Sequence, residues 1–382
     1  MLLRVPHFFS QFKCLAGQCS DTCCVGWEID IDDATLAKYR DMATLCECAG
    51  SARSNKKEFI RKLLKSIEGT HFKLEAGDRC PFLNQKGLCD VICNLGCNGT
   101  PQDENGESIL CDICREHPRF VEVYGDIMEK GLGLCCEEAA RLLLTSEPPP
   151  GARESCLTLM ESRVDDPPDE LPDGVEEARD AIFQEREAIF GILADKSLPL
   201  NERLVEVLDF AQALSDSEDT SAPDKTFPDA NSHYEGVPTH QAVLQTWIEI
   251  LGEGESFGPA WDEAYRKMHQ KGWGQSQALF TEEDGARIVS YLIFRSYAKS
   301  LFDGDCLTKV QFSIFFWIIL RQFGHELAGF EPSITAPLTA KVNAIKLLSK
   351  QTEYSEEIMD ILANNFFENP AFSLEQFRRI LE

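Results

Sequence analysis

The stretch Cys14-Leu-Ala-Gly-Gln-Cys19-Ser-Asp-Thr-Cys23-Cys24 is a dense run of cysteine that decides how the first third of the chain is organised. Further cysteines follow as Cys80, Cys89, Cys111-x2-Cys114 and Cys135-Cys136. In all, 14 of the 16 cysteines lie within the first 136 residues. Thiolates are the preferred ligands of zinc and of iron–sulfur clusters, both held by four protein ligands in closed sites. The sequence therefore predicts a metal-binding module here.

The length of 382 residues favours two domains, or one domain with a large extension. A hydrophobic content of 43% and a charged content of 26% are ordinary for a folded protein. Proline-rich acidic runs at 147–151 and 165–172 interrupt regular structure. We expect a cysteine-rich metal or iron–sulfur module over residues 1–146, an acidic linker over 147–180 and a helical domain over 181–382.

The charge balance limits the partners. The chain has 37 Lys and Arg against 64 Asp and Glu, a net charge of -27, which repels phosphate backbones. We expect no nucleic-acid partner and favour a lysine-bearing protein, although acidity also serves solubility. No apolar run reaches the roughly 20 residues that span a bilayer, and the first residues do not resemble a signal peptide. We therefore expect a cytoplasmic protein with reduced thiols and no transmembrane segment.

The fold class we expect is mainly α, with a small α+β cysteine-rich module followed by an all-helical region. Alternation over 26–32 predicts a short strand, 71–74 a second strand, and 120–134 a hairpin. Asp32 or Asp33, Asn55 and Asn201 are candidate helix caps, and Ser373-x-x-Gln376 is a candidate capping box. Residues 216–238 read as a polar linker. The later helices that we expect are residues 240–251, 259–269, 282–301, 308–327, 338–349, 355–366 and 373–381.

Spacing narrows the kind of metal site. An ordinary zinc ribbon needs two Cys-x-x-Cys knuckles, whereas this chain has one, Cys111-x2-Cys114. Adjacent cysteines such as Cys23 and Cys24 point in different directions, so we expect one of each adjacent pair to ligate. Ligands scattered over a hundred residues favour a cluster held by several loops. Two sites, or one site plus packed cysteines, both remain open.

Other candidate residues have two readings each. His117 could ligate or act as a base, but such a histidine more often packs. Arg115 and Arg119 flank the expected cluster and could hold a carboxylate, or they could balance thiolate charge. The run Cys89-x3-Cys93-x3-Cys97 is one residue away from the spacing of radical S-adenosylmethionine enzymes, but no barrel pattern accompanies it. We interpret four cysteines as plain thiols: Cys46, Cys48, Cys156 and Cys306.

Several motifs together resemble the flagellin lysine N-methylase family and the broader cysteine-rich zinc- or iron-chelating domains. They are Phe12-Lys-Cys14, Cys19-Ser-Asp-Thr-Cys23-Cys24, Gly26-Trp27-Glu-Ile-Asp-Ile, Cys80-Pro-Phe-Leu83, Leu88-Cys89, Leu110-Cys111-Asp-Ile-Cys114-Arg115 and Pro118-Arg119. Similar motifs continue through 136–142, Tyr291-Leu-Ile-Phe-Arg295 and Tyr354-Ser355-x-Glu357. The chain departs from the pattern at Cys93, Cys97 and Cys135, which look like extra cysteines, and at an inserted stretch over 98–108.

The resemblance implies an S-adenosylmethionine-dependent protein-lysine N-methyltransferase that acts on flagellin and carries a cysteine-bound four-iron (4Fe-4S) cluster. Arg115 and Arg119 are the candidates for S-adenosylmethionine, and no catalytic base stands out. Two rivals are a non-enzymatic zinc- or iron-chelating or electron-transfer module with a helical docking domain, and an extracellular disulfide protein. The metal ligands that we expect are Cys14, Cys19, Cys23, Cys24, Cys80, Cys89, Cys111 and Cys114.

Overall fold

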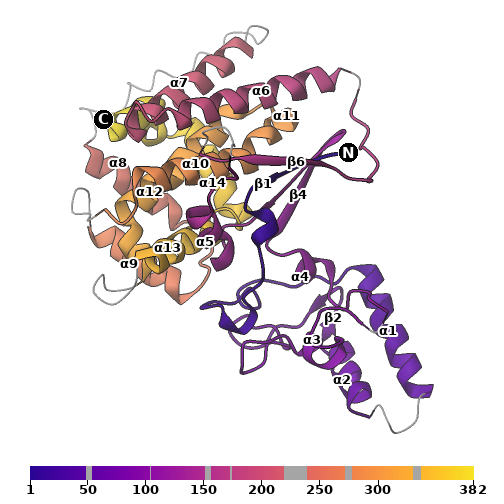
Figure 1. Cartoon of the computed structure of the whole chain (residues 1–382). Coiled ribbons are helices and arrows are strands. Elements are labelled where there is room, and N and C mark those ends of the chain that lie inside the picture. Colours follow the sequence, from indigo (N-terminus) through magenta and orange to yellow (C-terminus); the bar gives the residue numbers. More distant parts are fainter. Residues whose placement is uncertain are drawn as a thin grey trace. The chain divides into compact units, whose positions relative to one another are not determined.

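The computed structural model describes residues 1–48, 54–103, 105–150, 156–172, 174–218, 239–271, 278–329 and 337–382. Over these residues the protein is mainly helical with a small sheet, which confirms the expected fold class at that level (Figure 1). The chain divides into two compact units. The cysteine unit is Lys13–Phe120 with Cys136–Glu138, and the helical unit is Met1–Phe12, Val121–Cys135 and Ala139–Glu382.

The larger sheet has the strand order β4-β5-β1-β6. Its strands are β1 (Leu2–Pro6), β4 (Arg119–Tyr124), β5 (Ile127–Leu132) and β6 (Leu159–Arg163). The expected hairpin is confirmed as β4 and β5, which turn at Gly125 with a φ of 71°. β1 lies parallel to β5 and antiparallel to β6, and the sequence had predicted neither β1 nor β6. The expected domain boundaries at residues 146 and 180 stay a prediction. In the structure, residues 1–12 and 121–135 belong to the same compact unit as the later helices.

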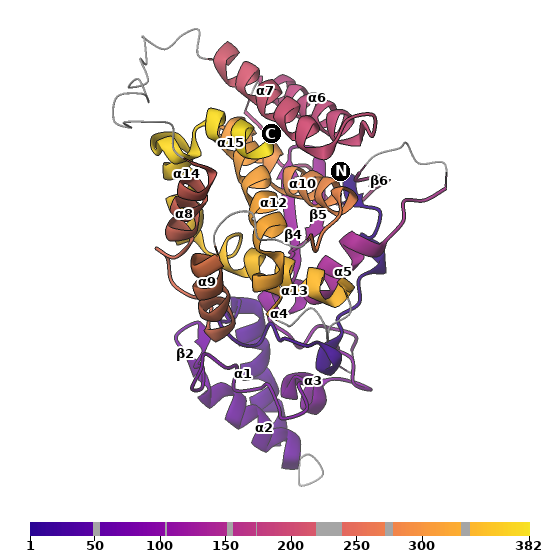
Figure 2. The same ribbon diagram turned by 90° about the vertical axis from the view of Figure 1, so that its left-hand side faces the viewer.

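The helices of the helical unit pack around α12, which Figure 2 shows at its centre. Their bounds are α6 (Val175–Ala194), α7 (Leu200–Glu218), α8 (His240–Leu251), α9 (Pro259–Lys271), α10 (Glu282–Ser296), α11 (Ser300–Asp303), α12 (Cys306–Ala328), α13 (Pro337–Gln351), α14 (Glu356–Glu368) and α15 (Leu374–Leu381), with α5 (Glu137–Thr145) starting in the cysteine unit. α12 is buried nearly all round, as expected for a helix that is apolar on every side. No helix in the described ranges has the length and apolarity needed to cross a membrane.

Two of the predicted helix caps, Asn55 and Asn201, were wrong, and Asn55 lies within a helix that includes Ser54. α7 begins at Leu200, and the side chain of Asn201 instead binds the carbonyl oxygen of Leu381 and the guanidinium of Arg321. The predicted helix start at Ser373 is confirmed, since α15 begins at Leu374 with Ser373 as its cap residue, but Ser373 makes no side-chain capping bond. At Asn201, tertiary packing of the side chain overrides the local capping signal. Residues 219–238 of the expected polar linker lie outside the part of the chain that the structure describes.

The cysteine unit packs two helices, α1 (Asp33–Cys48) and α2 (Ser54–Lys65), against loops. It also contains β2 (Ile67–Glu68), β3 (His71–Phe72), α3 (Asp90–Leu95) and α4 (Asp112–Glu116). The predicted start of α1 is confirmed, since the Asp32 carboxylate accepts the Thr35 N–H at 2.8 Å. The strand predicted over 26–32 is wrong: Gly26 has a φ of 97°, which breaks the extended backbone and leaves isolated bridges.

Candidate metal centre

The backbone of the cysteine unit brings Cys24 and Cys80 side by side. The Cys80 N–H donates to the Cys24 carbonyl at 2.8 Å, and the Gly26 N–H donates to the Asp78 carbonyl at 3.0 Å. A single β-bridge joins Val25 to Arg79 between these two bonds. The left-handed Gly26 lets the chain leave this short pairing immediately. Two cysteines that are 56 residues apart in sequence are therefore fixed by main-chain bonds.

A tight loop then carries Cys89 back toward the same place. The Asp90 N–H donates to the Phe82 carbonyl at 2.7 Å, and a bridge pairs Leu83 with Cys89. Arg79 donates to the carbonyls of Leu83 and Asn84, which fixes the start of this loop. Cys89 is the residue before the first turn of α3, so its backbone position is set by the helix start.

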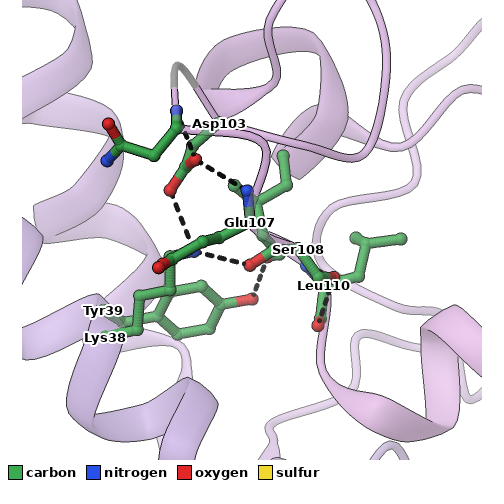
Figure 3. A network of polar contacts seen from close by, with 8 residues as sticks. Lys38, Tyr39, Asp103, Glu107, Ser108 and Leu110 are labelled. Carbon is green, nitrogen blue, oxygen red and sulfur yellow. Dashed lines mark hydrogen bonds and ion pairs between the residues drawn. The ribbon is translucent and has the colours of Figure 1, made fainter. Parts of the chain in front are cut away.

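Residues of α1 hold the segment that leads into the Cys111-x2-Cys114 knuckle (Figure 3). Tyr39 donates its hydroxyl to the Ile109 carbonyl at 2.8 Å. Lys38 binds the Ser108 carbonyl and pairs with the carboxylates of Asp103 and Glu107 at 2.9 and 3.0 Å. The hydrogen bond from Lys38 holds the pKa of Asp103 at about 2. The predicted insertion over 98–108 is thus tied to α1 in its described part, and the chain enters Cys111 from a fixed segment.

These contacts gather five thiols, which we call the inner thiol group. Its members are Cys24, Cys80, Cys89, Cys111 and Cys114. Burial raises the pKa of Cys80 to about 12 and that of Cys89 to about 11, and the charges of neighbouring thiolates raise both further. A hydrogen bond between Cys111 and Cys114 lowers the pKa of the first and raises that of the second. Forming several thiolates here is therefore unfavourable without a bound cation to offset their charges.

A second set of thiols lies beside the first, and we call it the outer thiol group. It consists of Cys14, Cys19, Cys23 and Cys136. A hydrogen bond from Cys23 lowers the pKa of Cys24 to about 6 and links the two groups. Burial raises the pKa of Cys19 to about 11, and its thiol donates to the Glu137 carboxylate at 3.4 Å. Glu137 also accepts from the Ser20 N–H at 2.8 Å.

The eight predicted ligands therefore all fall into these two groups, and each carries a thiol rather than a disulfide. Soft thiolates suit zinc or iron, so the chemistry of the donors fits a metal centre. In the described parts of the chain, however, no three Cys, His, Asp or Glu side chains are arranged closely enough to hold one ion. The ligand set and the number of sites stay predictions.

The other residues singled out in the sequence lie as follows. Arg115 pairs with Asp112 and Glu116, both at 2.8 Å, and Arg119 begins β4. The His117 ring packs against Trp27 at 5.4 Å between ring centroids. Cys93 is exposed, and Cys156 and Cys306 each donate to a main-chain carbonyl in the helical unit. The side chains of Cys46 and Cys48 lie outside the described residues.

The ligand prediction left out two residues that the structure brings to the thiols. Cys136 belongs to the outer thiol group, and its place directly before the helix that carries Glu137 is the signal that could have found it. The positive charge of Arg79 contributes to the low pKa of Cys24. Arg79 had no sequence signal of its own, because its role depends on the short pairing with Val25.

The two C-terminal motifs meet in the helical unit. Tyr291 exchanges hydrogen bonds with the main chain of Leu132, each at 2.6 Å. Arg295 pairs with Glu353 at 2.9 Å and lies over the Tyr354 ring at 5.1 Å. Burial and the charge of Cys135 raise the pKa of Tyr354 well above its ordinary value. These motif residues form one buried polar cluster against the end of β5.

Three relatives are similar to part of the chain. This chain is 29% identical over 143 residues to the flagellar biosynthetic protein FliU of Salmonella muenchen. The matched region covers 36% of this chain and 75% of FliU. Lysine-N-methylases of Salmonella typhimurium and Salmonella choleraesuis are also 29% identical over 143 residues, or 31% of their length. The resemblance is confirmed. The match spans less than a third of the two lysine-N-methylases. No family model and no solved structure matches.

Proposed function

We propose that the protein is an S-adenosylmethionine-dependent protein-lysine N-methyltransferase that acts on a flagellin-type substrate and carries a cysteine-held iron–sulfur cluster. The observation that carries the proposal is the main-chain pairing that brings cysteines from separated segments together, in a chain similar to proteins named lysine-N-methylase. The relative named flagellar biosynthetic protein supports flagellin as the substrate. The acidic chain, with its net charge of -27, favours association with a lysine-bearing partner.

The reaction requires a neutral lysine amine. Lysine has an ordinary pKa of about 10.4, so the amine must release a proton to a base or to solvent before it attacks. The amine nitrogen then forms a bond to the methyl carbon, while the carbon–sulfur bond of the sulfonium breaks and its electron pair stays on sulfur. The products are methyl-lysine and S-adenosylhomocysteine. Arg115 and Arg119 remain the candidates to bind the carboxylate of S-adenosylmethionine.

The inner thiol group is the natural holder of the cluster. When bound, an iron–sulfur cluster supplies a rigid inorganic centre whose irons thiolates ligate. On the protein side, Arg79 favours the thiolate form of Cys24, and the hydrogen bond with Cys114 favours the thiolate form of Cys111. Metal binding requires deprotonated cysteines, so both features favour loading at neutral pH.

The test is methyl transfer from S-adenosylmethionine carrying a radiolabelled methyl group. We expect the full-length, anaerobically purified protein to label the host's own flagellin, and not flagellin whose lysines have been acetylated. Acetylation removes the nucleophilic amine without removing the polypeptide. A metal-loaded protein that neither binds S-adenosylmethionine nor labels flagellin would contradict the proposal and would indicate the non-enzymatic metal-binding module instead.

A further inference from the structure

A cavity of about 780 Å³ lies in the helical unit between α6 and one face of the sheet, where residues of β1, β5 and β6 line it. Leu159 and Glu161 of β6 line one side, and Asp180, Phe183 and Glu187 of α6 line the other. These α6 residues are spaced three and four apart, so they share one face of the helix. We call this cavity the β6–α6 groove. It is separate from the thiol groups, which lie in the cysteine unit.

The chemistry of the groove suits a cation. Three carboxylates line it, from Glu161, Asp180 and Glu187, against the single positive charge of Arg4. Arg4 shows how a cation binds there: its guanidinium lies over the Phe183 ring at 5.0 Å and pairs with Glu161 at 2.9 Å. An aromatic face with a nearby carboxylate is a favourable environment for an ammonium group. Asp180 also pairs with Arg179 at 2.8 Å, which leaves Glu187 as the exposed carboxylate at the end of the α6 face.

The free edge of β6 can also bind main chain. Met1 and Val164 exchange two main-chain hydrogen bonds, and this pair fixes which residues of β6 bond to β1 and which face away from it. By the register Leu2 to Arg163, the N–H and C=O groups of Leu159, Glu161 and Arg163 point away from β1. Within the described residues β6 pairs with β1 alone. An exposed edge of this kind binds an extended peptide as an added strand.

We propose that the β6–α6 groove binds an extended, lysine-bearing segment of the partner protein as an added strand on β6. The segment's main chain pairs with the outward groups of β6, and its alternate side chains reach the groove carboxylates. The choice of lysine rests on the proposed function. The site is a docking groove for the substrate polypeptide.

The test uses the full chain and a fluorescein-labelled synthetic peptide of alternating Thr and Lys, roughly eight residues long, which is enough to span a strand. Fluorescence anisotropy at low salt measures its affinity. We expect Glu187→Lys to weaken binding by about tenfold, since it replaces attraction by repulsion in the groove. The matched control is Glu206→Lys, the same charge change at an exposed position of α7 away from the groove, and it should change the affinity by less than about twofold.

A second peptide tests strand addition. Methylating the main-chain nitrogens of the lysines keeps every ammonium group but removes the donors that lie opposite Leu159 and Glu161 in antiparallel pairing, so this peptide should bind more weakly to the unchanged protein. Equal affinities of Glu187→Lys and Glu206→Lys, or of the two peptides, would overturn the proposal. So would a change of oligomeric state in Glu187→Lys with no change in peptide affinity, because the groove would then bind a second copy of the chain.

The outcomes separate this inference from the proposed function. If the peptide binds through the groove but flagellin is not methylated, the docking groove stands and the methyltransferase assignment fails. If flagellin is methylated with the same KM by Glu187→Lys and by the unchanged protein, the assignment stands and the groove proposal is wrong.

Discussion

The adjacent thiols of Cys23 and Cys24 share a hydrogen bond, and this makes them chemically unequal. Cys24 packs against the core of the cysteine unit, whereas Cys23 is exposed. The proton that Cys23 donates lowers the pKa of Cys24 to about 6. Their different surroundings agree with the rule that adjacent side chains point in different directions, although the two thiols still share a hydrogen bond.

In metal-free protein we expect Cys24 to react with iodoacetamide at a rate that reaches half its maximum near the pKa of about 6. Cys23→Ser keeps a donor and should leave this pH profile in place. Cys23→Ala removes the donor and should move the profile toward the ordinary thiol value of 9.0. Peptide mass spectrometry across a pH series measures the rate. Identical profiles for the two variants would show that Cys23 has no influence.

A glycine inside the polar cluster of the helical unit gives a second prediction at this scale. A Cβ at Gly133 would overlap the Tyr354 hydroxyl, whereas a Cβ at Gly191 in α6 meets nothing within 4 Å. We expect Gly133→Ala to destabilise the protein by about 1–3 kcal/mol through overpacking. Gly191→Ala should be neutral or stabilising by up to about 1 kcal/mol, because alanine favours helix. Urea midpoints measure both, and an equally stable Gly133→Ala would refute the packing around Tyr354.

At the scale of elements, α1 acts as the support of the Cys111-x2-Cys114 knuckle. Lys38 and Tyr39 bind the segment that leads into Cys111, and the Asp32 carboxylate accepts the Asp112 N–H at 2.9 Å. One helix thus fixes the chain on both sides of a candidate ligand. Loss of these bonds should loosen the knuckle without unfolding the helical unit.

We expect Tyr39→Phe to expose Cys111 to labelling in the metal-free protein. The change leaves the buried Ile109 carbonyl without its donor at a cost of about 1–3 kcal/mol, so the labelling rate should rise about fivefold or more. Tyr265→Phe on α9 is the matched control. The buried Cys306, in the helical unit, serves as an internal reference and should keep its rate in both variants. A similar rise at Cys306 would mean general destabilisation.

Periodicity predicted most of the described helices because their apolar faces repeat at helical spacing. The range 240–251 agrees with α8 residue for residue, and the hairpin of β4 and β5 was predicted from alternation around Gly125. β1 and β6 were missed for a physical reason. Each is only five residues long, and its pairing partner is far away in sequence, so local alternation carries too little information.

At the scale of the whole molecule, the two compact units differ in the size of their hydrophobic cores. The helical unit packs around the buried α12, whereas the cysteine unit places loops and thiols around two helices. A small unit of this kind gains stability when a metal ties its loops together. Its stability should therefore depend on metal far more than that of the helical unit.

Chelation tests this difference by hydrogen exchange. We expect removal of metal to speed amide exchange in the described residues between Lys13 and Phe120 and to leave α12 unchanged. Mass spectrometry of loaded and chelated protein measures both regions in one sample. A uniform change across the two units, or none in the cysteine unit, would contradict the proposed role of metal.

The sequence singled out eight candidate ligands, and all eight lie in the two thiol groups, but their binding of a metal stays a prediction. It could not divide them into an inner and an outer group. That division depends on long-range main-chain pairing, such as the bond between Cys80 and Cys24. The contributions of Arg79 and Glu137 follow from the same tertiary contacts, which local spacing does not encode.

The proposed function requires thiols from distant loops to hold an inorganic cluster. Iron, acid-labile sulfide and zinc analysis with EPR of the full chain, purified without oxygen, tests it most directly. We expect about four iron and four sulfide per chain, lost in Cys89→Ser and retained in Cys306→Ser. Stoichiometric zinc without iron, or the same iron content in both variants, would contradict the account.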